Sequence, residues 1–114
     1  MALLKSILKY GGSSTSTSGG TEVNHGSVEV DFGSSPGNNY KEVVVTGITG
    51  IKSNSIVKAY IDITATTDNT SEDIIVRNFN IGCKDIIAGA GFTIYIYCND
   101  GEVTGKINIK YEWY

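Results

Sequence analysis

Residues 92–98 read Phe-Thr-Ile-Tyr-Ile-Tyr-Cys, and this stretch decides the fold. Apolar residues alternate here, without a break, with threonine or tyrosine. Because successive side chains of a β-strand point to opposite faces, the alternation predicts a strand with one buried side. We expect its inner side to consist of Phe92, Ile94, Ile96 and Cys98, and its outer side of Thr93, Tyr95 and Tyr97.

The segment that follows has the same pattern. Asn99-Asp-Gly101 comes directly after the first stretch, and an Asp-Gly pair readily adopts the positive φ angles of a hairpin turn. Residues 103–113 then place on one side Ile107, Ile109, Tyr111 and Trp113. The sequence therefore predicts a hairpin between residues 92–98 and residues 103–113.

Strand-like segments also precede this pair. They are residues 27–32, 40–46, 56–64 and 74–81, with a further short strand within residues 82–90. Leucine, a good helix former, occurs only near the N-terminus, whereas Val, Ile, Thr and Tyr favour strands. About seven short strands separated by turns predict an all-β fold, a small antiparallel β-sandwich of jelly-roll or immunoglobulin-like type.

The N-terminal part of the chain differs from the rest. Residues 11–20 are Gly-Gly-Ser-Ser-Thr-Ser-Thr-Ser-Gly-Gly, which contain no apolar side chain for a core and predict a flexible linker. We therefore divide the chain into an apolar N-terminal peptide (1–10), a linker (11–26) and a β-domain (27–114). A ten-residue linker spans roughly 17 Å on average, which lets the domain stand clear of whatever holds the peptide.

Residues 1–10 are predicted to anchor the protein to a partner. Four apolar side chains fall on one face of a short helix: Leu3, Leu4, Ile7 and Leu8. So short a helix does not form alone in water, so a partner would have to order it. A frayed terminus and a membrane-surface helix are the alternatives. Lys5 and Lys9 interrupt the apolar run, which argues against a signal peptide, and the segment is far too short to span a membrane.

The charge balance argues against a nucleic-acid partner. The formal net charge is −3. Lys5 and Lys9 against Glu22 leave the N-terminal part at +1, so the remainder carries −4. A nucleic-acid-binding domain is expected to carry a basic patch instead.

The two cysteines, Cys83 and Cys98, allow two interpretations. They are either separate half-buried thiols or, if their strands are neighbours, a disulfide. A disulfide-stabilised secreted scaffold usually contains more cysteines. The pair alone therefore gives no evidence for a secreted protein.

Neither catalytic nor metal-binding residues form a recognisable pattern. His25, the one histidine, lies near the linker, away from any Ser or Cys nucleophile of the domain. Asp68, Glu72 and Asp73 lie in one polar loop, but they lack the central glycine and ligand spacing of a calcium loop. We expect no enzyme activity, no metal and no cofactor.

Outward-facing tyrosines are the candidate contact residues. Tyr60, Tyr95 and Tyr97, with Tyr40, are predicted to lie on a sheet surface opposite the core. Exposed aromatic residues suit contacts with a protein or a glycan. A subunit interface, a ligand or receptor contact, and ordinary surface tyrosines are the three interpretations.

Residues 28–113 resemble a family of small structural proteins of tailed bacteriophages. The segments that carry the resemblance are Val30-Asp-Phe-Gly33, Pro36-Gly37, Val45-Thr-Gly47, Val57-Lys-Ala-Tyr-Ile61, Cys83, Asp85-Ile-Ile-Ala-Gly-Ala-Gly-Phe-Thr-Ile-Tyr95 and Gly105. The resemblance implies a virion or tail-associated role without catalytic residues. Members of the family are expected to contain histidines in the polar loop, residues 67–73. This chain has none in that loop, so no role of such histidines carries over to it.

These observations predict a virion structural protein, either a capsid decoration or spike protein or a tail-associated subunit. Its partners would be other virion proteins, and it would form a homo-oligomer, with a trimer as one candidate state. We expect it to be assembled in the host cytoplasm and located in the virion, with no nucleic-acid partner. The alternative is a β-module that binds a glycan or a host receptor.

Overall fold

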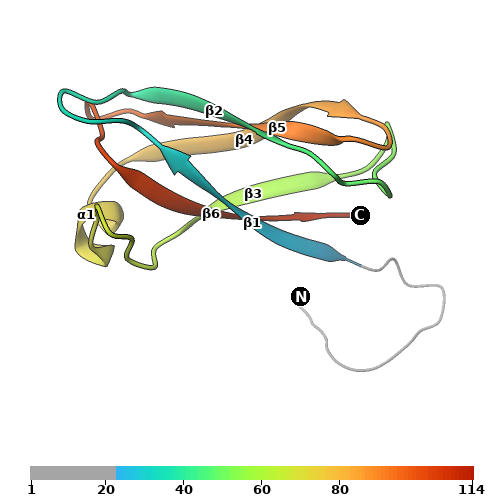
Figure 1. The fold of residues 1–114 in the computed structure, drawn as a ribbon, viewed down its shortest axis with the longest axis horizontal. Coiled ribbons are helices and arrows are strands. Elements are labelled where there is room, and N and C mark those ends of the chain that lie inside the picture. Colours follow the sequence, from blue (N-terminus) through green and yellow to red (C-terminus); the bar gives the residue numbers. More distant parts are fainter. Residues whose placement is uncertain (1–22) are drawn as a thin grey trace.

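The computed structural model describes residues 23–114, which form two antiparallel three-stranded sheets and one short helix (Figure 1). The strands are β1 (Asn24–Asp31), β2 (Tyr40–Val45), β3 (Val57–Asp62), β4 (Phe79–Ile87), β5 (Gly91–Cys98) and β6 (Lys106–Trp113). The helix α1 (Ser71–Ile75) lies between β3 and β4. The predicted mainly β architecture is confirmed.

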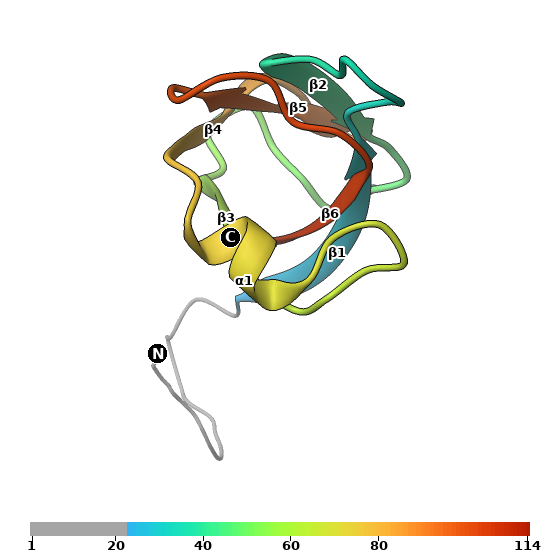
Figure 2. The same ribbon diagram turned by 90° about the vertical axis from the view of Figure 1, so that its left-hand side faces the viewer.

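The first sheet has the order β1-β6-β3 and the second the order β2-β5-β4. In the first, Ile109 of the central strand lies opposite Val28 and Ile61. In the second, Ile94 lies opposite Val43 and Cys83. Figure 2 shows the two sheets face to face. The two segments with the strictest alternation in the sequence thus become the two central strands.

The hairpin predicted between residues 92–98 and 103–113 is wrong. β5 and β6 belong to different sheets, and residues 99–105 carry the chain from one to the other. Val103, which is buried, anchors this crossing, since its N–H donates to the carbonyl oxygen of Asn38 at 2.8 Å. Each strand has a long apolar side, and facing sheets bury the two sides against each other, which a side-by-side hairpin would not do.

The core lies between the inner sides of the central strands. Phe92, Ile94, Ile96 and Cys98 each expose 2% or less of their surface, as predicted. From β6 the core receives Ile107, Ile109 and Tyr111. The rings of Phe92 and Tyr111 meet edge to face with centroids 5.2 Å apart, so the contact joins the two sheets. Full burial of a large apolar side chain contributes about 1.5–3 kcal/mol.

The strand predicted over residues 74–81 is also wrong, because α1 ends and β4 begins within it. Thr70 Oγ1 accepts a hydrogen bond from the Asp73 N–H at 3.1 Å, and the Asp73 carboxylate accepts one from the Thr70 N–H at 2.9 Å. Such a capping box starts a helix. β4 then continues to Ile87, so residues 23–114 contain six strands where about seven were predicted.

β1 begins at Asn24, within the range 11–26 that composition assigned to the linker. Its exposed and half-buried side chains alternate, so residues 24–26 belong to the β-domain. Residues 1–22 are outside the part of the chain that the structure describes. The predicted anchor residues are therefore not placed: Leu3, Leu4, Ile7 and Leu8.

β1 and β2 are edge strands of opposite sheets and lie on the same side of the molecule (Figure 2). Within residues 23–114, no strand pairing joins them. Figure 1 shows that they are close where residues 32–39 connect them and diverge toward the start of β1. We call this opening the β1–β2 seam, and its inward-facing residues are Val28, Val30, Val43 and Val45.

Candidate functional site

The outer surface of the second sheet is the strongest candidate for a contact site. Along β5 its outward side chains are Thr93, Tyr95 and Tyr97, as the sequence predicted. Tyr40 lies directly opposite Tyr97, and Val44 opposite Thr93, on the neighbouring strand β2. We call this surface the tyrosine face, and β2, β5 and β4 contribute to it Tyr40, Glu42, Val44, Thr93, Tyr95, Tyr97, Asn80, Gly82 and Lys84.

A glycine on the neighbouring strand makes room for the ring of Tyr95. Gly82 of β4 lies directly opposite Tyr95, and a Cβ at this glycine would come within 2.5 Å of the tyrosine hydroxyl oxygen. The ring therefore lies across the space that a side chain at position 82 would fill. Tyr95 is half-buried as a result, whereas Tyr40 and Tyr97 expose 42% and 39% of their surface and Val44 exposes 66%.

One polar link crosses the tyrosine face. The Tyr40 hydroxyl donates to Glu42 Oε2 at 2.6 Å, and Lys84 Nζ donates to the same oxygen at 2.7 Å. The hydrogen bond from Lys84, followed by that from Tyr40, lowers the pKa of Glu42, and the bond to Glu42 raises the pKa of Lys84 and of Tyr40. Because Lys84 is on β4 and Glu42 on β2, this ion pair ties the two edges of the sheet together across β5.

Tyr60 does not join the other predicted contact residues. It lies on β3, in the first sheet, whose outer surface is opposite the tyrosine face. We call this surface the charged face, since most of its outward positions carry charge: Glu29, Asp31, Lys58, Asp62, Lys106, Lys110 and Glu112. Desolvation, followed by Glu112 and Asp62, raises the pKa of Tyr60. The expectation of one tyrosine surface thus holds for Tyr95, Tyr97 and Tyr40, and not for Tyr60.

A shallow recess of about 390 Å³ adjoins Tyr60 on the charged face. Besides this ring, its lining includes His25, Ser27 and Lys110. His25 is exposed on β1, in a strand rather than in the linker range 11–26 to which the sequence analysis assigned it. An aromatic ring beside donors and acceptors is the kind of surface on which a sugar can stack.

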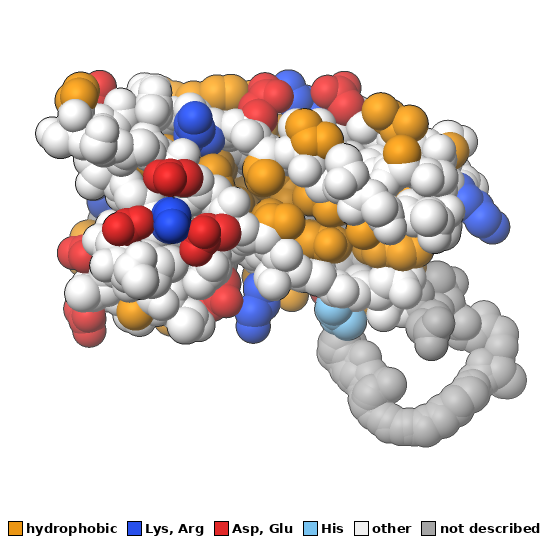
Figure 3. Space-filling model, viewed as in Figure 1, with side chains coloured by type: hydrophobic (Ala, Val, Ile, Leu, Met, Phe, Trp, Pro, Cys, Tyr) orange, Lys and Arg blue, Asp and Glu red, His pale blue; other side chains and the backbone are white. Residues whose placement is uncertain are grey.

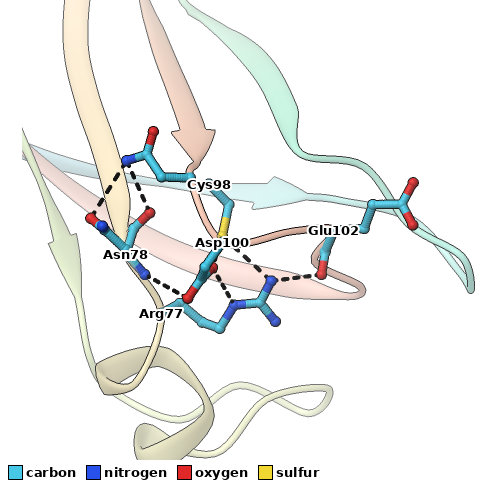
Figure 4. Close-up of polar contacts among 6 residues, drawn as sticks. Arg77, Asn78, Cys98, Asp100 and Glu102 are labelled. Atoms are coloured by element: carbon cyan, nitrogen blue, oxygen red, sulfur yellow. Dashed lines mark hydrogen bonds and ion pairs between the residues drawn. The ribbon is translucent and has the colours of Figure 1, made fainter.

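A polar cluster that the sequence analysis missed surrounds Arg77, at the junction of α1 and β4 (Figure 4). Arg77 Nε donates to Asp100 Oδ1 at 3.1 Å, and Nη2 donates to the Glu102 carbonyl oxygen at 2.7 Å. The Cys98 thiol donates to Asp100 Oδ1 at 2.7 Å. The bonds from Cys98 and Arg77 lower the pKa of Asp100. The one arginine of the sequence was the available signal.

This cluster fixes the crossing from β5 to β6. Asp100 also accepts from the Asn78 N–H, at 3.3 Å, so it joins the start of β4 to the loop after β5. Cys98 is 1% exposed, so its thiol does not face solvent. The arrangement is that of a structural clamp rather than of a reactive thiol, which needs access and a base.

The two cysteines are both free. Cys83 of β4 lies opposite Ile94, whereas Cys98 lies opposite Phe79, so they are four positions apart along β5. This separation excludes the disulfide that the sequence left open. Burial raises the pKa of Cys83 to about 11.

The polar side chains of residues 68–73 bind backbone groups at the start of α1 and of β6. Asp73 caps α1, and Asp68 Oδ2 accepts from the Lys106 N–H at 3.1 Å. Asn69 Nδ2 donates to the carbonyl oxygens of Thr104 and Lys106, both at 3.0 Å. Within residues 23–114, no group of three His, Cys, Asp or Glu side chains is arranged to hold a metal ion.

Comparison of the chain with protein-family models, curated proteins and solved structures gives no match. In the described part of the chain, no helix has the length and apolar character needed to cross a bilayer.

Proposed function

We propose that the chain is a structural protein of a bacteriophage particle, a capsid decoration or spike protein or a tail-associated subunit. The observation that carries the proposal is the tyrosine face. It presents three tyrosines and Val44, and its one ion pair is already satisfied within the sheet. Aromatic-rich surfaces poor in unpaired charge are typical of the buried centres of protein–protein interfaces.

The segments that resemble phage structural proteins support this proposal through their structural roles. Asp31 Oδ1 accepts from the Gly33 N–H at 2.8 Å and shapes the turn after β1. Gly91 lies so close to the carbonyl oxygen of Val45 that any Cβ would collide with the backbone. Residues that shape turns and strand contacts are what a shared scaffold requires, and they need no common active site.

In the proposed arrangement, residues 1–10 attach the protein to a neighbouring subunit and the β-domain forms the body. The finer fold class, a β-sandwich of jelly-roll or immunoglobulin-like type with about seven strands, belongs to the same proposal. It is supported by the connections, since each one except β4–β5 passes from one sheet to the other. The tyrosine face would contact another virion protein or another copy.

The first test is mass spectrometry of purified particles with a count of copies. We expect many copies for a decoration protein and few for a spike or tail subunit. A chain missing from purified particles, although made in the infected cell, contradicts the proposal.

A second test concerns the tyrosine face. The pair Tyr40→Ser with Tyr97→Ser is expected to lower the occupancy of the protein on particles, since the contact loses its central aromatic area. Tyr60→Ser, on the charged face and 43% exposed, is the matched control and is expected to leave occupancy unchanged. Equal occupancy of the two variants would rule out the tyrosine face as the contact surface.

The second candidate is a module that binds a glycan or a host receptor. The recess beside Tyr60 favours it. A glycan array probed with the full chain should then give signals that Tyr60→Ala abolishes. An array without signal, or one that Tyr60→Ala leaves unchanged, excludes this candidate.

A further inference from the structure

The β1–β2 seam leaves apolar surface open to solvent. Figure 3 shows hydrophobic side chains gathered in a recess at the centre of this view, between the strands of the two sheets. Val28 of β1, Val43 of β2 and Ile48 of the following loop pack against the core but are only half-buried. Trp113 is half-buried as well, and its ring would touch a Cβ at Gly50, at 3.0 Å.

The seam also leaves two strand edges without partners. β1 pairs only with β6 and β2 only with β5, so within the described residues the edges that face each other form no ladder. Open edges bind extended segments through their N–H and C=O groups, and alternate side chains enter the apolar space between the sheets. The seam therefore has both elements of an acceptor site for a β-strand.

We propose that the seam receives residues 1–10 of a second copy of the chain as an added strand. In an extended segment, one side would consist of the even-numbered residues Ala2, Leu4, Ser6, Leu8 and Tyr10, none of them charged. Both lysines, Lys5 and Lys9, fall on the other side. One uncharged side and one side with lysines match a groove with an apolar floor and a solvent-facing opening.

The length of the intervening chain argues for a second copy. Adjacent antiparallel strands of one chain need only about two to five connecting residues. Here twelve residues, 11–22, separate Tyr10 from Val23. Fully extended, they reach about 40 Å, which is the scale of the distance to a neighbouring domain. Head-to-tail insertion of this kind closes into a ring when the rotation between copies permits.

Lys41 gives the seam its selectivity. It is the charged residue on the inward-facing side of β2, and it is half-buried. Inward-pointing charges are a device by which edge strands resist indiscriminate pairing. A strand bound in the seam must cover the apolar stem of Lys41 while the amine of Lys41 stays in water. A polar strand offers too little apolar area to cover this stem.

This inference rests on the proposed role of residues 1–10 in attachment and names their receptor as a second copy. The test is light scattering of the purified full chain after size-exclusion chromatography. We expect an oligomer for the wild type and a monomer for Leu4→Asp with Leu8→Asp. Leu3→Asp with Ile7→Asp is the matched control and should remain oligomeric, since these residues are on the solvent side of the added strand.

A helical anchor predicts a different result, because Leu3, Leu4, Ile7 and Leu8 would share one face and both pairs would be equally damaging. A monomeric wild type, or equal masses for the two paired variants, overturns the inference. These substitutions lie outside the β-domain, so a folding defect does not explain a loss of mass. In the seam, Val43→Asp should give a monomer. Val76→Asp, at the end of α1 and 73% exposed, lies outside both the seam and the tyrosine face and should not, with circular dichroism to verify that both variants are folded.

The inference and the proposed function fail separately. If the full chain is monomeric but deletion of residues 1–12 removes it from particles, the segment binds another virion protein and the seam inference is wrong. If the chain forms the oligomer but purified particles lack it, the strand insertion stands and the virion role is wrong.

Discussion

Each sheet contains one glycine that lies opposite a tyrosine, but the two pairs lie on opposite sides of their sheets. In the first sheet, Gly26 of β1 lies opposite Tyr111, whose ring is on the inner side and only 8% exposed. In the second, Gly82 of β4 lies opposite Tyr95, whose ring is on the outer side. The tyrosine face thus uses a packing arrangement that the first sheet reserves for its core. In both sheets, the absence of a Cβ at the glycine leaves room for the opposite ring.

The two glycine–tyrosine pairs should differ most in how much stability is lost when the tyrosine ring is removed. Tyr111→Ala is expected to cost about 3–5 kcal/mol, since it empties core space and removes the edge-to-face contact with Phe92. Tyr95→Ala is expected to cost about 1–2 kcal/mol in the isolated chain, because the ring is only half-buried. Urea denaturation measures both. Equal losses would mean that Tyr95 already has a core role without a partner.

Substitution of the glycines should also cost more stability in the first sheet than in the second, but each loss should be smaller than that at the opposite tyrosine. A Cβ at Gly26 would collide with the end of the Tyr111 ring, which is buried and packed against Phe92, so Gly26→Ala is expected to cost about 1–3 kcal/mol. At Gly82, Tyr95 can swing outward, and the lower entropy of the unfolded chain offsets part of the loss, so the change should stay below about 1 kcal/mol. The midpoints of urea unfolding test this ranking. A larger loss of stability at Gly82 than at Gly26 would contradict the placement of the Tyr111 ring on an inner side and of the Tyr95 ring on an outer side.

The third prediction concerns the clamp around Arg77 and Asp100 at the β5–β6 crossing. The pKa of Asp100 is lower in the folded chain than in the unfolded chain, so the unfolded state binds more protons as the pH falls through the carboxylate range. The stabilisation is therefore present near neutral pH and disappears in acid. Asp100→Asn should be less stable than the wild type at pH 7, and the difference should vanish at low pH.

Denaturation at several pH values measures this difference, and the comparison with Asp100→Asn cancels the acid sensitivity of Glu42 and Asp62, whose pKa values are also lowered. A difference that stays constant across pH would show that the asparagine disturbs packing rather than charge.

The smallest effect should come from the ion pair on the tyrosine face. Lys84 and Glu42 each expose 39% of their side chains, so salt screens their attraction. Lys84→Met should remove a small, salt-sensitive part of the stability while leaving the sheet folded. Unfolding midpoints at low and high salt would show it, because the wild type and the variant should converge as salt is added. Divergence with salt would contradict an electrostatic origin.

The sequence predicts the individual strands well because alternation is a local property. The inner side of residues 92–98 followed directly from it, and so did the buried side of residues 107–111. The outer positions of Tyr95 and Tyr97 come from the same reasoning. Each of these predictions depends only on which neighbours along the chain share a face.

Predictions that depend on pairing between distant residues failed. Asn99-Asp-Gly101 resembles a hairpin turn, but the buried Val103 and its bond to Asn38 carry the chain across the core. Tyr60 has the outward position that its strand predicts, but the membership of β3 in the first sheet separates it from Tyr95. Arg77 was missed because its partners come from a loop more than twenty residues away.

The place of β6 in the chain has a consequence for the order of events during synthesis. Of the six strands in residues 23–114, β6 is the last to be made, and it is also the central strand of its sheet. β1 and β3 therefore leave the ribosome without their shared partner, whereas the second sheet can be completed at Cys98. Such long-range pairing slows folding and keeps apolar strands exposed in the meantime. The nascent chain can therefore complete the first sheet, and bury its apolar strands, only after the eight residues of β6 have been made.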